Sequence, residues 1–325
     1  MDSKRNTLIL GGNGFIGSHL VDRLIANGNA VRVFDKYPER YRLPLPAVNY
    51  HFGDFGNRGL LSDALRDIDI VYHLISTSLP KTSNDDPSFD VQSNVIETLF
   101  LLEQCLTHKI CKIVFVSSGG TIYGRPAHLP ITENFPTDPE CSYGISKLTI
   151  EKYLALFNRL HGLEYAIVRP SNAYGSRQNP AGIQGAISVF LGRVAVNEPI
   201  EIWGDGEVVR DYIYIDDLVD GIHKAATRSA EERIFNLGSG TGYSLNQIVE
   251  TIRAVTGKDV KVAYKAKRAF DVPRIILDIN RARNLLRWAP AIPLEIGIKK
   301  TWEFIRDLKL RSGQTMQGLA CPQKE

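Results

Sequence analysis

A tyrosine and a lysine four residues apart are the side chains of this sequence best suited to move a proton. At this spacing a helix would place Tyr143 and Lys147 on one face. The pKa of a free tyrosine is about 10, which is too high for a base at neutral pH. A neighbouring ammonium group lowers that pKa by favouring the phenolate. The same pattern occurs on ordinary solvated helix faces, so its meaning depends on its surroundings.

Three glycines near the N-terminus form a second suggestive pattern. The apolar run at residues 7–10 has the length of a strand, and Gly11, Gly14 and Gly17 follow it before a helical pattern begins. Gly11 would allow a tight turn, Gly14 a close approach of the backbone to a pyrophosphate, and Gly17 close packing of helix on strand. The N–H groups at the start of the helix would face the anion. The stretch predicts a dinucleotide-binding turn.

An acidic residue supports the same site. A second strand-like run, residues 31–34, ends at Asp35, near the spacing of about 20 residues at which a carboxylate binds the ribose 2′-hydroxyl. Asp35 would repel a 2′-phosphate, so it favours NAD over NADP as the cofactor. Lys36, which follows directly, weakens that preference.

A polar loop connects the two patterns. The apolar run at residues 113–116 leads into residues 117–121, which are two serines, two glycines and a threonine. In open α/β sheets, ligands bind at the carboxyl ends of the strands, where this loop would lie. Tyr143 and Lys147 come one element later, and the positive nicotinamide of a bound dinucleotide would also favour the phenolate. We therefore interpret the pair as catalytic.

Composition sets the broad class. The 325 residues are 43% hydrophobic and 23% charged, with a formal net charge of +3, as in an ordinary soluble globular protein. The basic residues are scattered, so we expect no nucleic-acid partner. No apolar run approaches the ~20 residues of a membrane span, and the N-terminus lacks the apolar core of a signal peptide. The cysteines show no CxxC pairing, so we expect no metal site, no disulfide framework and a cytoplasmic location.

Periodicity predicts the fold class. Apolar strands alternate with amphipathic helices in the first half, which indicates an α/β protein with a doubly wound parallel sheet of the Rossmann type. Strands are expected at residues 7–10, 31–34, 49–52, 68–74, 113–116, 165–168, 200–203 and 212–215. Helices are expected at residues 18–26, 60–65, 89–107, 143–160, 218–226, 244–256 and 302–308. Ser244 and Gly257 would cap one of them.

The chain resembles the extended short-chain dehydrogenases/reductases, and within them the UDP-glucose 4-epimerase (UDP-hexose 4-epimerase) branch, from about residue 7 to 308. The motifs that carry the resemblance are the glycine pattern, Asp35, Gly53-Asp54, His73-Leu74, residues 117–124, Tyr143-xxx-Lys147, residues 169–175, 203–206 and 210–212, and Arg268-xx-Asp271. The resemblance implies bound NAD, a UDP-sugar substrate and a homodimer built on helices 89–107 and 143–160.

The resemblance also implies a division of the chain. Residues 1–170, with about 211–236, would form the NAD-binding Rossmann domain. Residues 171–210 and 237–310 would form a smaller α/β domain that binds the nucleotide sugar. Residues 311–325 are polar without periodicity, so we expect a flexible tail.

Individual roles follow from the matching motifs. The implied cofactor site consists of Gly11, Gly14, Phe15, Ile16, Gly17, Asp35, Lys36, Asp54, Phe55, Leu74, Asn94, Ser117, Tyr143 and Lys147. Within it, Asp54 and Phe55 would contact the adenine, Asp35 the adenosine ribose and Lys147 the nicotinamide ribose.

The implied substrate site lies in the second half. Asn172 would hold the diphosphate between Arg210 and Arg268, whose guanidinium groups suit phosphate oxygens, and Asp271 would lie near the uridine ribose. Trp203 could flank the uracil, although core packing is the commoner role of a lone tryptophan on an apolar strand.

One position departs from the family pattern. The family places a Ser or Thr beside the reacting hydroxyl at the position that is Gly119 here. Thr121 or Ser118 could supply that hydroxyl from a neighbouring position, with Thr121 favoured, or Tyr143 could act alone. The loop also lacks the Asp-Glu pair of the family's dehydratases, which disfavours elimination.

These motifs predict epimerisation at C4 of a UDP-hexose. Tyr143 would take the proton from O4 while NAD accepts the C4 hydride, the 4-keto sugar would turn, and the hydride would return to the other face. The alternatives are a keto-sugar reductase, a nucleotide-sugar decarboxylase and, less favoured, a non-catalytic dinucleotide-binding protein. Ile275 appears at the position where a bulky aromatic would restrict an N-acetyl group, which hints at tolerance of N-acetylated hexoses.

Overall fold

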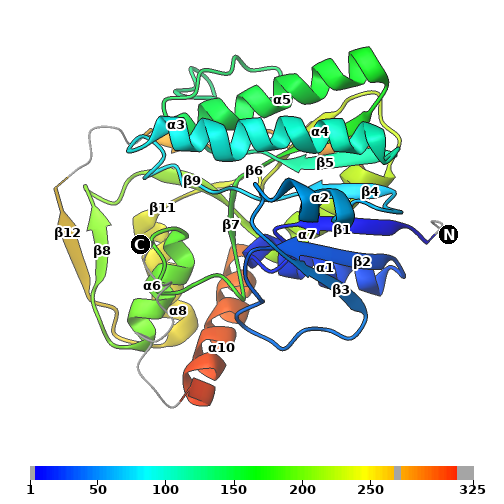
Figure 1. Ribbon diagram of the computed structural model, residues 1–325. Helices are drawn as coiled ribbons and strands as arrows, with labels where there is room; N and C mark the ends of the chain where they lie inside the picture. Colours follow the sequence, from blue (N-terminus) through cyan, green and yellow to red (C-terminus); the bar gives the residue numbers. More distant parts are fainter. Residues whose placement is uncertain (1–3, 267–271, 313–325) are drawn as a thin grey trace.

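The computed structural model describes residues 4–266 and 272–312. Its centre is a parallel sheet of seven strands (Figure 1). In spatial order the strands are β10 (Ile234–Leu237), β6 (Glu164–Pro170), β5 (Lys112–Val116), β4 (Ile70–His73), β1 (Asn6–Leu10), β2 (Ala30–Asp35) and β3 (Val48–Phe52). The strand order reverses direction between β1 and β4, which is the point where doubly wound sheets bind their ligands.

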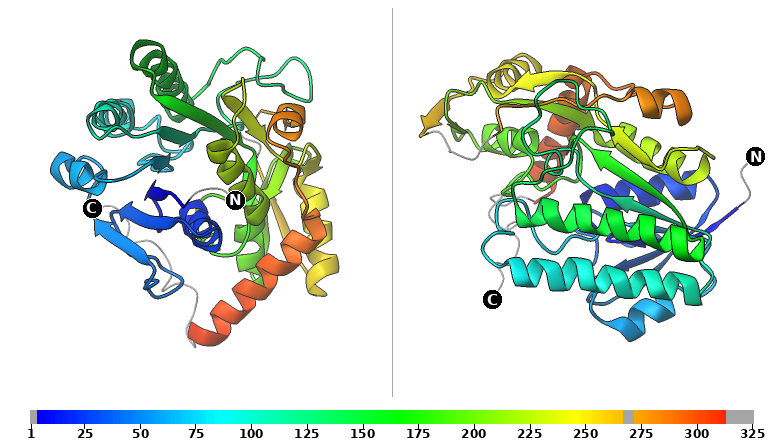
Figure 2. Two further views of the ribbon diagram at one scale, coloured as in Figure 1. Left: turned by 90° about the vertical axis from the view of Figure 1, so that its right-hand side faces the viewer. Right: turned by 90° about the horizontal axis from the view of Figure 1, so that it is seen from above.

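Helices cover both faces of this sheet, because its strands are apolar on both sides. Leu8 and Leu10 of β1 belong to one core cluster with side chains of α2 (Arg58–Ala64), α4 (Glu97–Thr107) and α5 (Ser142–His161). Ile9 points the other way, into a cluster with α1 (Phe15–Ala26) and α7 (Ile215–Thr227). Figure 2 shows α4 and α5 side by side on one face. The predicted Rossmann architecture is confirmed.

A smaller region follows β6. Its strands β7 (Asn172–Tyr174), β9 (Val209–Tyr214), β11 (Gly242–Ser244) and β13 (Arg274–Ile275) form one sheet, and β8 (Ile200–Trp203) pairs with β12 (Val262–Lys265). Around them lie the helices α6 (Ala186–Ala195), α8 (Leu245–Thr256) and α10 (Leu294–Ser312), whereas α9 (Asn280–Leu285) packs beside β10 of the central sheet. The chain returns to the central sheet with α7 and β10. Residues 211–214, which precede α7, still belong to β9 and pair within the smaller sheet.

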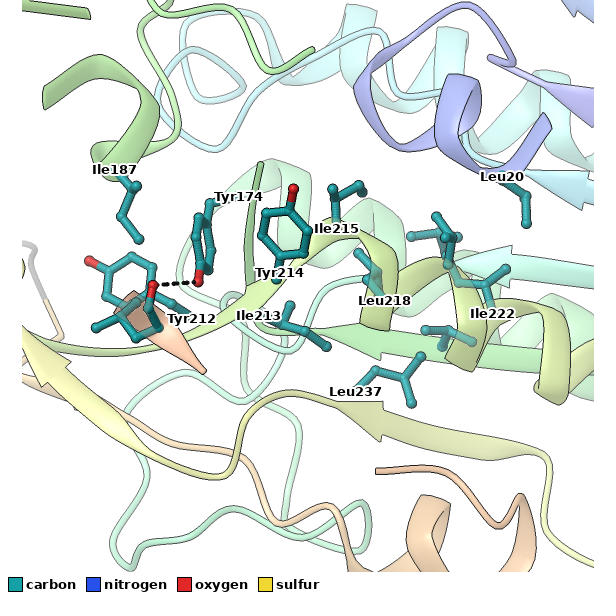
Figure 3. Close-up of a cluster of buried hydrophobic side chains, with 14 of the residues drawn as sticks. Leu20, Tyr174, Ile187, Tyr212, Ile213, Tyr214, Ile215, Leu218, Ile222 and Leu237 are labelled. Carbon is teal, nitrogen blue, oxygen red and sulfur yellow. Dashed lines mark hydrogen bonds between the residues drawn. The ribbon is translucent and has the colours of Figure 1, made fainter. Parts of the chain in front are cut away.

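One continuous core joins the two regions. The rings of Tyr174, Tyr212 and Tyr214 pack edge to face, with centroid distances of 5.6–6.5 Å. Figure 3 shows these rings at one end of a row that continues through Leu218 and Ile222 of α7. Such contacts fix the smaller region against the central sheet, because close-packed interiors resist relative movement.

Several helices differ in extent from the sequence prediction. Helix α8 has the predicted capping box, in which the side chain of Ser244 accepts from Gln247, and it ends at Gly257. Helix α1 begins at Phe15, before the predicted start. Helix α10 is much longer than predicted and includes Gly297, a poor helix former. A β-carbon on Gly297 would lie 2.1 Å from the hydroxyl oxygen of Tyr174, so tertiary packing selects glycine there.

The helix predicted at residues 89–107 is interrupted. The chain is helical from Pro87, but α3 (Pro87–Asp90) leads into a π-helical segment (Val91–Ile96) before α4 begins. Within that segment the side-chain amide of Asn94 donates to the carbonyl of Asp90 at 3.1 Å. Single π turns inside helices often mark functional sites.

Candidate active site

A cavity of about 610 Å³ opens at the carboxyl ends of the central strands. This volume is in the range of small-molecule binding sites. Its wall includes the start of α1, the loops after β4 and β5, the first turns of α5, and residues of β7, α6, β8 and β9. Both regions of the chain therefore contribute to one cavity.

The glycine turn is shaped as the sequence predicts. Gly11 has φ = +83° and donates its N–H to the carbonyl of Phe34 at 2.9 Å. A β-carbon on Gly17 would lie 2.1 Å from the carbonyl oxygen of Gly11. Gly14 is the N-cap of α1 and has no side chain to occupy the first N–H groups of the helix, which stay available to an anion. Phe15 and Ile16 of the first turn line the cavity.

Asp35 lies at the end of β2 and holds the glycine turn. Its carboxylate accepts hydrogen bonds from the backbone N–H groups of Asn13 at 2.9 Å and Tyr37 at 3.3 Å. Burial raises the pKa of Asp35, and these N–H groups oppose that shift. Sequence reasoning missed this bracing of the turn, because it depends on how two distant segments meet.

The next acidic residue, Asp54, pairs with Lys36. The ammonium nitrogen lies 3.0 Å from a carboxylate oxygen, and both side chains are exposed. The N–H of Gly56 and the Lys36 ammonium lower the pKa of Asp54. Phe55 is buried in the core, with its ring 5.2 Å from that of His73. The ring of Phe55 is therefore not available to contact an adenine.

The loop after β5 brings three hydroxyl groups to the cavity. Ser117, Ser118 and Thr121 all line it, and the buried hydroxyl oxygens of Ser117 and Thr121 have no hydrogen-bond partner within the described chain. An unpartnered buried hydroxyl is costly unless a ligand or water satisfies it. Thr121 therefore has the unused hydrogen-bonding capacity that a substrate hydroxyl would need.

Gly119 does not face the cavity. A β-carbon there would lie 2.6 Å from the Leu277 side chain and 3.0 Å from the carbonyl oxygens of Arg169 and Pro170. A serine at this position would therefore point into packed atoms, so the geometry gives no support to restoring the family's hydroxyl by that substitution.

Tyr143 and Lys147 lie on the first two turns of α5 and both line the cavity. The Lys147 ammonium donates to the carbonyl of Val116 at 3.1 Å and lies 5.6 Å from the centre of the Tyr143 ring. Gly144 allows this turn to approach Thr121, since a β-carbon there would be 3.1 Å from the Thr121 carbonyl oxygen. The predicted helix face and the predicted loop do come together.

Burial sets the titration of both groups. Lys147 is 4% exposed, and desolvation lowers its pKa to about 8, against the raising effect of the Asp90 and Glu151 carboxylates. Burial raises the pKa of Tyr143, and the Asp90 carboxylate adds to that rise. The protein alone therefore keeps Tyr143 protonated at neutral pH, and the phenolate needs a further positive charge in the cavity.

The loop at residues 76–86 holds the start of α5. The N-cap residue Cys141 has no side-chain cap. Instead, the backbone N–H of Ser142 donates to Asn84 at 2.9 Å and that of Tyr143 donates to Ser83 at 3.0 Å. Sequence reasoning missed these caps because they come from 58 and 60 residues upstream and local patterns describe only caps next to the helix.

Two other predicted cofactor residues have different positions. Leu74 lines the cavity. Asn94 is buried and its side chain is engaged inside the protein: it accepts from the N–H of Thr77 at 3.0 Å and donates to the Thr77 hydroxyl at 2.8 Å and to the Asp90 carboxylate at 2.9 Å. Asn94 thus braces the loop that lines the cavity.

The predicted substrate residues divide into two groups. Asn172, Trp203 and Arg210 line the cavity from β7, β8 and β9. Trp203 is 42% exposed, so the core-packing interpretation of this residue is wrong. Arg268 and Asp271 lie outside the described residues.

Ile275 lies apart from the cavity. It is buried in a small cluster with Ile122, Tyr123, Ile131 and Leu277, and it does not appear in the cavity wall. Nothing in the described geometry connects Ile275 with the sugar.

Among the described residues, the site has the features that a bound dinucleotide requires. A glycine turn stands at the start of an uncapped helix, two buried hydroxyl groups lack partners, and a buried lysine lies beside a tyrosine. The residues that would hold NAD are the glycine turn, Asp35, Leu74, Ser117 and Lys147. Within residues 4–266 and 272–312, no cluster of three acidic, histidine or cysteine side chains could bind a metal, and no helix is long and apolar enough to span a membrane.

Comparison with known proteins defines the class. Residues 7–238 match the NAD dependent epimerase/dehydratase family. A putative UDP-glucose 4-epimerase of Methanocaldococcus jannaschii is 37% identical, and the match covers 92% of this chain and 98% of that protein. The chain therefore belongs to the NAD dependent epimerase/dehydratase family.

The similarity extends over nearly the whole chain in other members as well. The crystal structure of UDP-glucose 4-epimerase from Thermotoga maritima with UDP-glucose has a TM-score of 0.89 and 36% identity, and the match covers 93% of this chain and 99% of that one. A dTDP-4-dehydro-6-deoxyglucose reductase of Escherichia coli is 34% identical over 94% of this chain and 99% of its own length. Overall identity alone therefore does not separate epimerase from reductase.

Proposed function

We propose that the protein is an NAD-dependent UDP-hexose 4-epimerase. The observation that carries the proposal is the single cavity lined both by the Tyr143 and Lys147 pair and by Asn172, Trp203 and Arg210. The first pair suits proton transfer at a sugar hydroxyl. The second set offers an amide, an exposed aromatic face and a guanidinium, the groups that a uridine diphosphate needs.

When bound, NAD supplies reversible acceptance of a hydride at the sugar C4. Tyr143 takes the proton from O4 as the carbonyl forms and gives it back when the sugar is reduced on its other face. The Lys147 ammonium, held by the Val116 carbonyl, stabilises the phenolate form of Tyr143. No net oxidation results, because the same hydride leaves and returns.

Thr121 is the residue that we propose as the hydroxyl partner of O4. Its hydroxyl is buried, unpartnered in the described chain and in the cavity wall. Ser118 also lines the cavity and is the second choice. A hydroxyl beside Tyr143 would orient the substrate for proton transfer.

The decisive experiment incubates purified protein, without added cofactor, with UDP-glucose, UDP-galactose and their N-acetylated counterparts. Interconversion of a 4-epimer pair without build-up of NADH would support the proposal. Tyr143→Phe should lower turnover by about 10²–10⁴-fold, whereas Tyr153→Phe on the same helix should be close to the parent. Substantial turnover in Tyr143→Phe would contradict the assignment.

A keto-sugar reductase is the second candidate, favoured by the similarity to the Escherichia coli reductase. A reductase would consume NADH or NADPH in proportion to a 4-keto sugar substrate and would leave UDP-hexoses unchanged. Parallel assays with such a substrate separate the two reactions.

We further propose a homodimer that buries the outer faces of α4 and α5. Helix α5, which lies beside α4, carries exposed apolar side chains, including Ile145 at 51% and Leu160 at 62% exposure. Sedimentation should give a dimer, and Leu160→Glu should weaken it. We also propose cytoplasmic action, in keeping with the free thiols of Cys105, Cys111 and Cys141.

The division of the chain is part of the same proposal. We assign NAD binding to residues 1–170 together with about 211–236, and nucleotide-sugar binding to residues 171–210 and 237–310. The two strand systems support this division, because the cavity takes Phe15 and Ile16, next to the glycine turn, from the first region and Trp203 from the second.

A further inference from the structure

Asp90 carries a carboxylate that is 1% exposed and lies beneath the first turns of α5. One oxygen accepts from the hydroxyls of Ser142 and Ser146, each at 2.7 Å. The other accepts from the Ser78 hydroxyl and from the Asn94 amide. All four donors are neutral, and no ion pair of Asp90 occurs among the residues that the structure describes.

Three of these donors come from the two segments that shape the catalytic corner of the cavity, and the fourth, Asn94, comes from the π-helical segment. Ser142 precedes Tyr143 and Ser146 precedes Lys147, so both catalytic side chains are flanked by serines tied to Asp90. Ser78 belongs to the loop in the cavity wall. Charge-assisted hydrogen bonds of this kind are stronger than neutral ones. One carboxylate therefore fixes the loop and the helix relative to each other.

The charges around Lys147 single out Asp90 as its counter-charge. Two carboxylates, Asp90 and Glu151, favour the Lys147 ammonium. Glu151 is already neutralised, because Arg169 binds both of its oxygens, with distances of 3.0 and 2.5 Å. The other titratable groups near Lys147 are Tyr143 and His73, and burial keeps His73 neutral by lowering its pKa to about 3. Of the two carboxylates, Asp90 is therefore the one whose charge no arginine neutralises among the described residues.

We propose that Asp90 is a positioning residue of the catalytic pair: it fixes the Tyr143–Lys147 turn through Ser142 and Ser146 and supplies the negative charge that keeps buried Lys147 protonated. The inference about the protonation of Lys147 concerns the protein alone and does not depend on the reaction. Its effect on turnover rests on the proposed epimerase function. Asp90 does not line the cavity, so it acts only through these neighbours.

The direct test measures the titration of Lys147 by NMR in protein labelled at lysine Cε and Nζ, with Lys147→Met to assign the resonance. Asp90→Asn keeps the shape and removes the charge, and should lower the pKa of Lys147 by about one unit or more. Asp86→Asn is the matched control: it lies four residues earlier, is exposed, and caps α3. It should leave the Lys147 pKa unchanged.

Two further variants separate charge from hydrogen bonding. Ser146→Ala keeps the Asp90 charge, so the Lys147 pKa should stay near the parent value. An unchanged Lys147 pKa in Asp90→Asn, or an equal shift in Ser146→Ala, would overturn the counter-charge role. If Asp90→Asn does not fold, Asp90→Ser replaces it, since a hydroxyl with a water can satisfy the same donors.

Kinetics then test positioning. With an active enzyme, Asp90→Asn and Ser146→Ala should each lower kcat at least tenfold with little change in KM. A rise in KM at constant kcat would contradict positioning. The NMR titration needs no turnover, so a failure of the proposed epimerase reaction would be seen separately from a failure of the Asp90 inference.

Discussion

Gly17 stands so close to Gly11 that a β-carbon on Gly17 would lie 2.1 Å from the Gly11 carbonyl oxygen. Gly14, three residues earlier, is different: its β-carbon would lie 3.4 Å from that same oxygen, an ordinary contact. Gly17 is therefore needed for the fold of the turn, whereas the absence of a side chain at Gly14 leaves room for a ligand.

This contrast gives a prediction for two matched substitutions. Gly17→Ala should destabilise the protein by about 1–3 kcal/mol, because the helix must move away from the strand. Gly14→Ala should keep the parent melting temperature but lose much of its NAD affinity. Thermal unfolding with and without added NAD measures both effects, and a Gly14→Ala protein with full NAD affinity would contradict the assignment of the turn.

A second prediction concerns the hydroxyl of the β5 loop. Thr121→Val removes an unpartnered hydroxyl and keeps the shape, so kcat should fall about 10²-fold with stability unchanged. Thr149→Val is the matched control, because Thr149 is a half-buried threonine of α5 that does not line the cavity. If Thr121→Val retains full activity, Ser118→Ala becomes the decisive variant.

A third prediction concerns Gly119→Ser, which should lower stability without raising turnover. Its β-carbon meets Leu277 at 2.6 Å and two backbone carbonyls at 3.0 Å, so we expect a loss of about 1–3 kcal/mol of stability and no gain in turnover. Denaturant unfolding and initial rates check the two parts. A faster, equally stable Gly119→Ser enzyme would show that the serine side chain does reach the cavity.

Trp203 provides a prediction about binding. Because its side chain is exposed in the cavity wall, Trp203→Ala should raise KM for the UDP-sugar at least tenfold without lowering the melting temperature. Tyr264→Ala on the adjacent strand β12, which is 57% exposed, is the control and should leave KM unchanged. A large loss of stability in Trp203→Ala would instead indicate a packing role.

The burial of His73 predicts that the stability of the protein falls as the solution becomes more acidic. Its folded-state pKa is about 3, against an ordinary value of 6.5, because the ring is fully buried. Between these values the unfolded chain binds a proton that the folded chain does not, so stability falls as pH falls, by about 1.4 kcal/mol per pH unit for this group. His73→Gln should flatten that slope, whereas exposed His128→Gln should not. Urea unfolding between pH 4 and 7 measures it.

The sequence was most informative where function depends on residues that are close along the chain. The glycine turn, the Tyr143 and Lys147 spacing and the order of strands and helices could all be predicted, because each is set by local periodicity or by a short motif. Those elements placed six of the predicted cofactor residues at one cavity: Phe15, Ile16, Leu74, Ser117, Tyr143 and Lys147.

What could not be predicted depends on contacts between distant segments. Nothing near Asp90 in the sequence indicates that it would receive Ser142 and Ser146. The length of α10 was underestimated because Gly297 breaks the helical pattern for the sake of Tyr174. The core-packing interpretation of Trp203 was wrong for the same reason, since exposure is decided by which elements pack over a strand.

The caps that Ser83 and Asn84 place on α5 carry one more consequence. The loop that contributes Ser78, Leu79 and Pro80 to the cavity wall also holds the backbone N–H groups of Ser142 and Tyr143. Any outward swing of this loop must break those two hydrogen bonds and release the first turn of the catalytic helix. Opening of this loop to exchange a bound molecule therefore also disrupts the catalytic geometry, because both changes break the same two hydrogen bonds.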